Sequence, residues 1–119
     1  MEGFLQSLKF DKPHIQVEVC KLVGLAAKRR GSKRTKAWKS KQVLWWQGVE
    51  FSRHSEYYQN LLDRAYGELA KNDSFKRALL ATNNAVLTHS IGRSNSSETV
   101  LTTNEFCSRL TKLRDQLKG

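Results

Sequence analysis

The first ten residues contain the side chains whose types and spacing best suit chemistry. If this segment is a helix, Glu2, Gln6 and Lys9 lie at i, i+4 and i+7 on one face. Phe4, Leu5 and Leu8 lie on another face. A carboxylate, an amide and an ammonium group would then lie beside an apolar wedge. Because chain termini usually fray, an ordered pattern here suggests that the segment is docked onto the rest of the protein. On these residues alone, however, a short amphipathic turn with a solvated polar stripe is the favoured interpretation.

Two further pairs of residues are candidates for a binding site. Arg53 and His54 are expected near the start of a helix, where free amide groups could bind an anion, although both are also commonplace surface residues. His89 and Ser90 precede Gly92, and a hydrogen-bonded structural pair is favoured there because no third residue is placed to orient the histidine. The chain contains no GxGxxG, P-loop, HExxH or GxSxG motif.

The segment 28–41 is strongly basic, with eight lysines or arginines among fourteen residues and no acidic residue. It could follow a nucleic-acid backbone, with Trp38 stacking on a base. It could instead clamp one phosphorylated small molecule. A mobile, solvated loop is favoured over both, because no second aromatic residue alternates with the basic ones.

Composition narrows the class of protein and of partner. The chain has 119 residues, which suits one domain, and 21 Lys and Arg against 11 Asp and Glu, which favours anionic partners. No apolar run could span a membrane and no leader sequence is visible, so we expect a cytoplasmic protein. Cys20 and Cys107 have no metal-ligand spacing and are expected to be reduced thiols. We expect no metal and no cofactor.

Hydrophobic periodicity and capping residues predict a mainly α-helical domain with short irregular or strand-like arms. The expected helices are 13–30, one from Ser52 or Ser55 to about Lys71, a short one ending near Ala81, and one that begins with a capping box at Thr102 and Glu105. Residues 85–91 are expected to form a brief strand or an irregular arm, and 92–97 a polar loop.

Apolar residues indicate which faces of these helices turn inward. In the short helix we expect Phe75, Ala78 and Leu79 to face the core. The last helix carries an apolar stripe of Phe106, Leu110, Leu113 and Leu117.

The segment 43–48 is too apolar to lie exposed. If it is helical, Trp45 and Trp46 point about 100° apart, so that one packs inward and the other lines a surface or cleft. Alternatively, both tryptophans fill the core.

Several short motifs resemble one known family. Glu2, Phe4, Gln6, Lys9 and Phe10 match a Glu-x-aromatic-x-Gln-x-x-Lys-Phe segment. Weaker matches follow in the same order: Ala27 to Gly31, Phe75 to Thr82, and Leu110 to Leu117. Through these segments, taken in order, the chain as a whole resembles the YbiA-like (NADAR) family.

The resemblance implies a single mainly α YbiA-like domain over 1–119 that lacks the family's usual N-terminal segment. It implies an N-glycosidase that hydrolyses a phosphorylated ribosyl or ADP-ribosyl substrate, with Glu2 as the catalytic carboxylate. The expected substrate-binding residues are Lys9, Lys28, Trp46, Arg53, His89 and Gly92. Two alternatives are a basic module that binds nucleic acid through residues 28–41 and a catalytically inactive YbiA-like scaffold.

Overall fold

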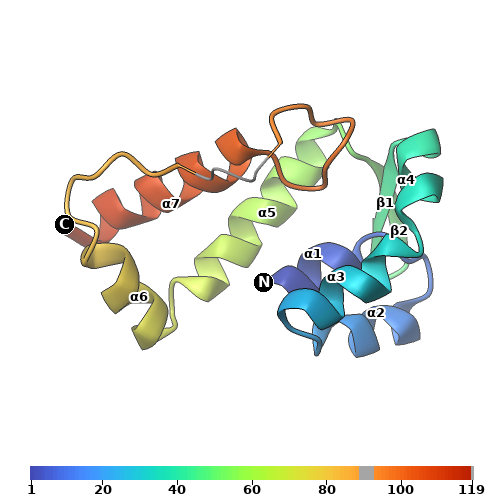
Figure 1. Ribbon diagram of the computed structural model, residues 1–119, viewed down its shortest axis with the longest axis horizontal. Coiled ribbons are helices and arrows are strands. Elements are labelled where there is room, and N and C mark those ends of the chain that lie inside the picture. The colour runs from blue at the N-terminus through green and yellow to red at the C-terminus, as the bar shows by residue number, and fades with distance from the viewer. Residues whose placement is uncertain (89–92, 119) are drawn as a thin grey trace.

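The computed structural model describes residues 1–88 and 93–118, which form mostly helices and one β-hairpin (Figure 1). The elements in chain order are α1 (Glu2–Ser7), α2 (Pro13–Cys20), α3 (Gly24–Ser32), α4 (Thr35–Lys41), β1 (Val43–Trp46), β2 (Val49–Ser52), α5 (Glu56–Leu69), α6 (Asp73–Leu80) and α7 (Thr103–Lys118). The predicted mainly α class is therefore confirmed. In the described part of the chain, no helix is long and apolar enough to cross a bilayer.

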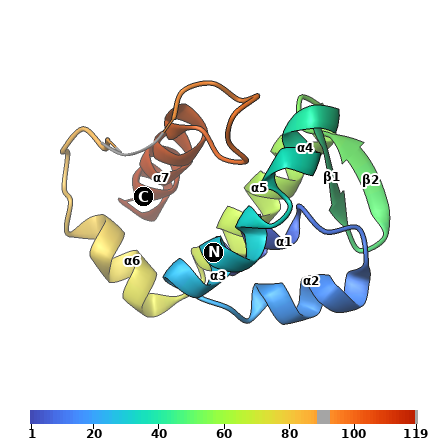
Figure 2. The ribbon, with the colours of Figure 1, turned by 45° about the vertical axis from the view of Figure 1, so that its right-hand side comes forward.

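The elements form two groups on either side of α5. Helices α1 to α4 gather with the hairpin on one side, and α6 and α7 lie on the other (Figures 1 and 2). The main core joins the first group to α5 and to the segment that precedes α7; it consists of Leu5, Leu8, Trp38, Leu44, Phe51, Tyr58, Leu61, Leu62 and Val100. The fold therefore has one dense core, with α6 and α7 attached to one side of it.

Helix α1 is docked onto the rest of the fold, so the solvated polar stripe favoured from its residues alone is wrong: Gln6 and Lys9 are both buried. A side chain at Gly3 would collide with backbone carbonyl groups at the end of α2, since its Cβ would lie 2.6 Å from the carbonyl oxygen of Cys20. Leu5 and Leu8 are buried in the core, and the carbonyl of Leu8 accepts a hydrogen bond from the backbone N–H of Trp45 at 2.9 Å. The segment is thus an interior element of the fold.

Gln16 connects this segment to the hairpin. Its buried side-chain Nε2 lies 3.1 Å from the carbonyl oxygen of Ser7, 3.0 Å from that of Phe10 and 2.7 Å from that of Trp45. Its Oε1 accepts a hydrogen bond from the backbone N–H of Gln47 at 3.0 Å. One amide side chain therefore connects backbone groups of residues 7–10 to those of the hairpin.

The predicted helix over 13–30 is wrong, because it is divided into α2 and α3. Val23 is extended, with φ −126° and ψ 152°, and Gly24 has φ +51°, in the left-handed region that favours glycine. The apolar repeat of the sequence runs across this break. The chain changes direction there and brings α3 back against α1.

The solvated loop favoured for 28–41 is also wrong, because this segment forms the end of α3 and all of α4. Trp38 is 1% exposed and belongs to the main core, so it anchors α4 and is not accessible to a nucleic-acid base. The indole supplies the burial that fixes a short and highly charged helix.

The segment 43–48 is not helical but belongs to an antiparallel hairpin in which Trp46 pairs with Val49. Gln47 and Gly48 have φ of 51° and 84°, which suits a two-residue turn with both central residues left-handed. Trp45 and Trp46 point to opposite faces of the strand and are both half-buried.

The C-terminal helices begin as predicted. Ser55 caps α5 by accepting a hydrogen bond from the backbone N–H of Tyr58, and the capping box of α7 is formed between Thr102 and Glu105 with N–H···O distances of 3.1 and 2.8 Å. Ala78 is exposed, contrary to expectation.

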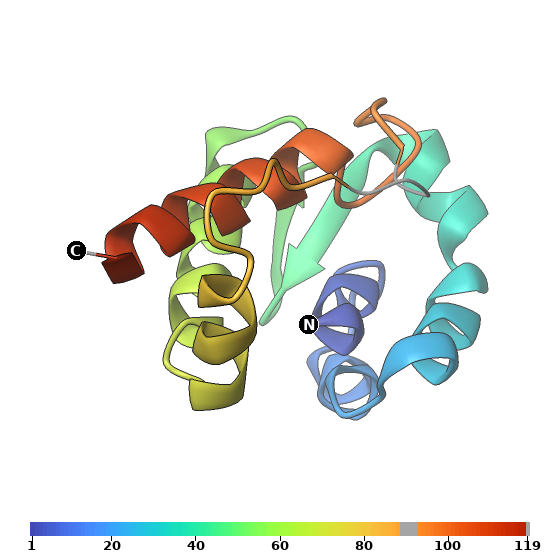
Figure 3. The ribbon, with the colours of Figure 1, turned by 60° about the vertical axis from the view of Figure 1, so that its left-hand side comes forward.

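In α7 the predicted apolar stripe is only half-buried, and the buried side chains are Glu105, Cys107 and Arg114. Polar contacts of Glu105 and Arg114 with other segments therefore orient this helix. The arm 83–88 runs beside it (Figure 3).

Candidate nucleic-acid interface

Helices α3 and α4 present most of the cations of the segment 28–41 to solvent. Six of the eight basic residues are exposed: Lys28, Arg29, Lys33, Lys36, Lys39 and Lys41. We call these six the α3–α4 face. Lys33 lies in the two-residue junction between α3 and α4, and the other five lie on these two helices.

The two other arginines of the segment turn inward and hold both helices against the N-terminal segment. The guanidinium of Arg30 lies over the ring of Phe10, 5.3 Å from its centroid. Nε of Arg34 donates a hydrogen bond to the carbonyl of Lys9 at 3.3 Å. The face is therefore fixed to the fold by members of the same basic run.

Gly31 permits the close approach of α3 to α1. A Cβ at this position would lie 2.6 Å from the side-chain Cδ of Gln6 and closer still to its Oε1, so a larger residue would force α3 away. Gln6 in turn donates a hydrogen bond from Nε2 to the carboxylate of Glu2 at 2.8 Å. The Glu2–Gln6 pair thus forms part of the surface on which α3 rests.

The charge of the α3–α4 face is not compensated by nearby carboxylates. Within residues 1–88 and 93–118, five ion pairs form, and none includes a basic residue of 28–41. Such clustered, unpaired cations at the surface attract polyanions and generate an attractive field over the whole patch.

Lys9 lies beneath this face. It is 7% exposed, and its Nζ donates a hydrogen bond to the hydroxyl of Thr35 at 3.3 Å. Burial lowers its pKa to about 8; the nearby carboxylate of Glu2 opposes this shift and the charge of Lys39 adds to it. Glu2 and Lys9 are therefore close enough to interact, although Lys9 lies beyond the end of α1 and not on one helical face with Glu2.

The other predicted site residues do not join them. Trp46 makes an edge-to-face contact with Phe4, with ring centroids 5.0 Å apart, and lines a separate cleft between Phe4 and α5. Arg53 is buried against Glu105, at the start of α7. Lys28 is exposed on α3, and His89 and Gly92 lie outside the described residues. The structure thus separates these residues among three surroundings.

No cluster of three or more His, Cys, Asp or Glu side chains in the described part of the chain is placed to hold a metal ion. The chemistry offered by the α3–α4 face and the groups beneath it is binding of anions through lysine and arginine.

Comparison with known proteins gives the ancestry of this arrangement. The family model described as bacteriophage protein GP30.3 matches residues 1–115. The chain belongs to the bacteriophage protein GP30.3 family. It is 40% identical to the uncharacterized 17.1 kDa protein in the Gp30-rIII intergenic region of Enterobacteria phage T4, over 98% of this chain and 78% of the relative. No solved structure matches the chain significantly.

Membership of the GP30.3 family corrects the resemblance to the YbiA-like (NADAR) family, which is wrong. The N-glycosidase activity, its catalytic role for Glu2, its ribosyl or ADP-ribosyl substrate and the inactive YbiA-like scaffold all depended on that resemblance and are withdrawn. The residues that suggested it make structural contacts in this GP30.3 member. Glu2 accepts a hydrogen bond from Gln6, and Gly31 leaves room for the side chain of Gln6. The ring of Phe10 packs under the guanidinium of Arg30.

Sequence reasoning identified the basic segment of this GP30.3 member but missed that it forms a fixed surface. A signal was present: Gly31 and Trp38, two uncharged residues of the run, are its buried positions. Reading them as core contacts would have predicted helices.

Proposed function

We propose that this protein binds nucleic acid through the α3–α4 face. The observation that carries the proposal is the set of six exposed cations on two consecutive helices and the junction between them, without carboxylate partners in the described part of the chain. Phosphate backbones are recognised by such sequence-independent positive surfaces. The proposal places the protein in the cytoplasm, as its sequence suggested.

The extent of the face favours a polymer over a single phosphorylated compound. With about 1.5 Å of rise per residue, α3 is about 13 Å long and α4 about 10 Å long. Phosphates follow one another every 3.4 Å or so along each strand of a duplex, so two such helices can contact several phosphates at once. A compound with one or two phosphates would leave most of these cations without a partner.

The burial of Trp38 favours a duplex over single strands. Single-strand binding usually combines a basic groove with aromatic side chains on which bases stack. The α3–α4 face offers no such ring, because the indole of the segment lies in the core. Contacts to the phosphate backbone alone suit double-stranded nucleic acid and predict little dependence on base sequence.

The direct test is binding to a fluorescent 20-base-pair duplex, measured by anisotropy at several salt concentrations. If all six cations contact phosphates, the plot of log K against log salt has a slope of about −5. The variant K33Q/K36Q/K39Q removes three contacts, so its slope should become shallower by about 3 and its affinity should fall at every salt concentration.

A matched control removes the same charge elsewhere. K71Q/R77Q/K112Q neutralises three exposed cations on or near α6 and α7 and should retain nearly all of the affinity. Equal losses in both triple variants would show that only net charge matters. Absence of binding at low salt would overturn the proposal outright.

A further inference from the structure

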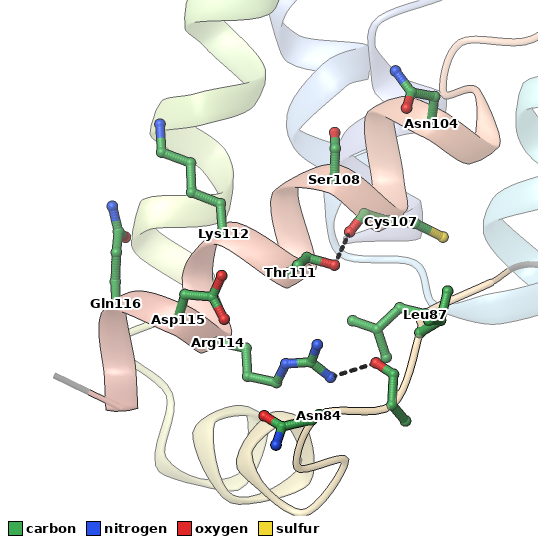
Figure 4. A pocket seen from close by; sticks show the side chains of 12 residues that line it. Asn84, Leu87, Asn104, Cys107, Ser108, Thr111, Lys112, Arg114, Asp115 and Gln116 are labelled. Carbon is green, nitrogen blue, oxygen red and sulfur yellow. Dashed lines mark hydrogen bonds between the residues drawn. The ribbon is translucent and has the colours of Figure 1, made fainter.

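A cleft of about 750 Å³ lies between α7 and the arm that follows α6 (Figure 4). One wall is formed by Cys107, Ser108 and Thr111 of α7, and the opposite wall by Ala85 to Leu87 of the arm. Arg114 lies at one end, where its guanidinium reaches from α7 to the arm (Figure 4). The cleft is remote in the fold from the α3–α4 face.

Arg114 is a buried cation without a counter-ion. It is 5% exposed, and its Nη1 donates hydrogen bonds to the hydroxyl of Thr82 at 2.8 Å and to the carbonyl of Ala85 at 2.9 Å. Both acceptors are neutral, and no carboxylate of the described residues lies within ion-pair distance. Its buried Nε has no hydrogen-bond partner. A guanidinium held in this way carries the cost of desolvation without the usual compensation.

The other buried arginine shows what is missing. Arg53 is 1% exposed, and its Nη1 and Nη2 donate to the two carboxylate oxygens of Glu105 at 3.1 and 2.6 Å, while its Nε donates to the carbonyl of Thr99 at 3.0 Å. All three nitrogens of Arg53 have partners. In Arg114 the edge formed by Nε and Nη2 has none among the described residues. That edge matches the geometry with which a carboxylate pairs with arginine through two parallel hydrogen bonds.

The walls of the cleft are mainly apolar. Val86 is 88% exposed, which is unusual for an aliphatic side chain, and Leu87 and Cys107 add further apolar surface. Thr111 donates its hydroxyl hydrogen to the carbonyl of Cys107 at 2.9 Å and so offers only lone pairs to a ligand. An apolar body therefore fits between these walls better than a polar one.

The net charge at the cleft favours a ligand with a single negative charge. Lys112 and Arg114 line it on the positive side and Asp115 on the negative side, which leaves an excess of one positive charge. A dianionic phosphate ester would meet the carboxylate of Asp115 with too few donors to balance it.

We propose that this cleft binds a monocarboxylate with an apolar body, with the carboxylate paired to Arg114 and the apolar body held between Leu87 and Cys107. Nε of Arg114 is closed off from solvent, so the arriving carboxylate has to displace the arm at Ala85 to form both hydrogen bonds. The arm is irregular and is fastened to α7 by contacts to Arg114 and Lys118.

Octanoate, 1-octanol and octyl phosphate are the probes, measured by isothermal titration calorimetry on the intact chain. We expect saturable binding of octanoate at one site, with 1-octanol and octyl phosphate each at least about tenfold weaker, because the charge-assisted pair with Arg114 requires one negative charge. Equal binding of octanoate and 1-octanol overturns the role of Arg114. Tighter binding of octyl phosphate overturns the carboxylate, and no binding of octanoate at millimolar concentration overturns the site.

Two variants test whether octanoate binds in this cleft. R114Q should lose at least about tenfold in affinity for octanoate while keeping the weak binding of 1-octanol. Since R114Q could also change the fold, V86E provides a second test at a fully exposed position: its carboxylate should repel octanoate from the cleft. V17E is the matched control, an exposed valine on α2 far from the cleft, and should bind octanoate as the natural chain does. If V86E binds as tightly as V17E, the ligand does not occupy this cleft.

Discussion

The two halves of the chain differ in how far their positive charges are paired with carboxylates. Residues 1–55 contain twelve Lys and Arg against four Asp and Glu, whereas residues 56–119 contain nine against seven. Four of the five ion pairs lie wholly within the second region, and the fifth joins Arg53 to Glu105 across the two. In the second region cations mostly serve the fold, whereas in the first region they remain available to a partner.

The contrast shows what pairing does in a small protein. Glu105 caps α7 and accepts hydrogen bonds from Nη1 and Nη2 of Arg53. It accepts another from the side chain of Gln59 at 2.8 Å. Tyr58 stacks under the same guanidinium and donates its hydroxyl hydrogen to the carbonyl of Val100. One carboxylate therefore fixes the position of α7 against α5 and β2. The α3–α4 face has no equivalent, and its helices rely on Trp38, Gly31 and two inward arginines.

The largest expected effect comes from removing the buried ion pair between Arg53 and Glu105. E105Q leaves the buried guanidinium of Arg53 without a counter-ion, so the free energy of unfolding should fall by about 3–5 kcal/mol. Urea denaturation followed by far-ultraviolet circular dichroism measures the change. E68Q is the control, since the exposed Glu68–Lys71 pair should contribute less than about 1 kcal/mol. Equal losses of unfolding free energy in the two variants would mean that the buried pair contributes no more to stability than the exposed pair.

A smaller effect is expected from one glycine on each side. G31A brings a methyl group against Gln6 and should destabilise the fold by about 1–3 kcal/mol. G67A, on an exposed face of α5 with no atom close to the new methyl group, should instead stabilise by about 0.5–1 kcal/mol. Thermal denaturation compares the two. If both substitutions stabilise the protein, α3 does not rest on α1 as described.

The smallest expected effect is a pH dependence from Lys9, a buried cation on the unpaired side. Burial lowers its pKa to about 8 from the ordinary 10.5, so the unfolded chain binds more protons than the folded chain between these values. Stability should therefore rise with pH in this window, by about 1 kcal/mol between pH 7 and 9.

The variant K9M should flatten this rise, and denaturation at pH 7, 8 and 9 tests it. Tyr66 has the opposite sign, since burial raises its pKa to about 12, but it acts only above pH 10. An unchanged slope in K9M would show that the ammonium of Lys9 is solvated in the fold.

Sequence patterns predicted the elements whose signals are local. Ser55 and Thr102 cap their helices through short-range hydrogen bonds that any chain with these residues could form. The mainly α class was likewise confirmed, because it follows from the spacing of apolar residues. The spacing of the first segment did not decide between a docked helix and a solvated turn, because the side chains that cover it come from distant parts of the chain.

The rest depended on backbone geometry and distant partners. The apolar repeat of α2 continues into α3, and only the left-handed backbone of Gly24 shows the break. The hairpin was missed because Gln47 in a left-handed conformation is uncommon, so the Gln47–Gly48 turn gives a weaker signal than Asn-Gly. The burial of Arg114 could not be predicted from its neighbours in the sequence, since it arises only when the arm 83–88 lies beside α7.

The hydrogen bonds of Gln16 make the N-terminal region a single cooperative unit. Because its amide group joins the end of α1, the start of α2 and the tip of the hairpin, none of these can open without releasing it. The backbone amides of Trp45 and Gln47 should therefore exchange with deuterium at a common rate, set by one opening event that includes residues 7–10. The α3–α4 face therefore packs against a region that unfolds in one cooperative step and does not fray from the N-terminus.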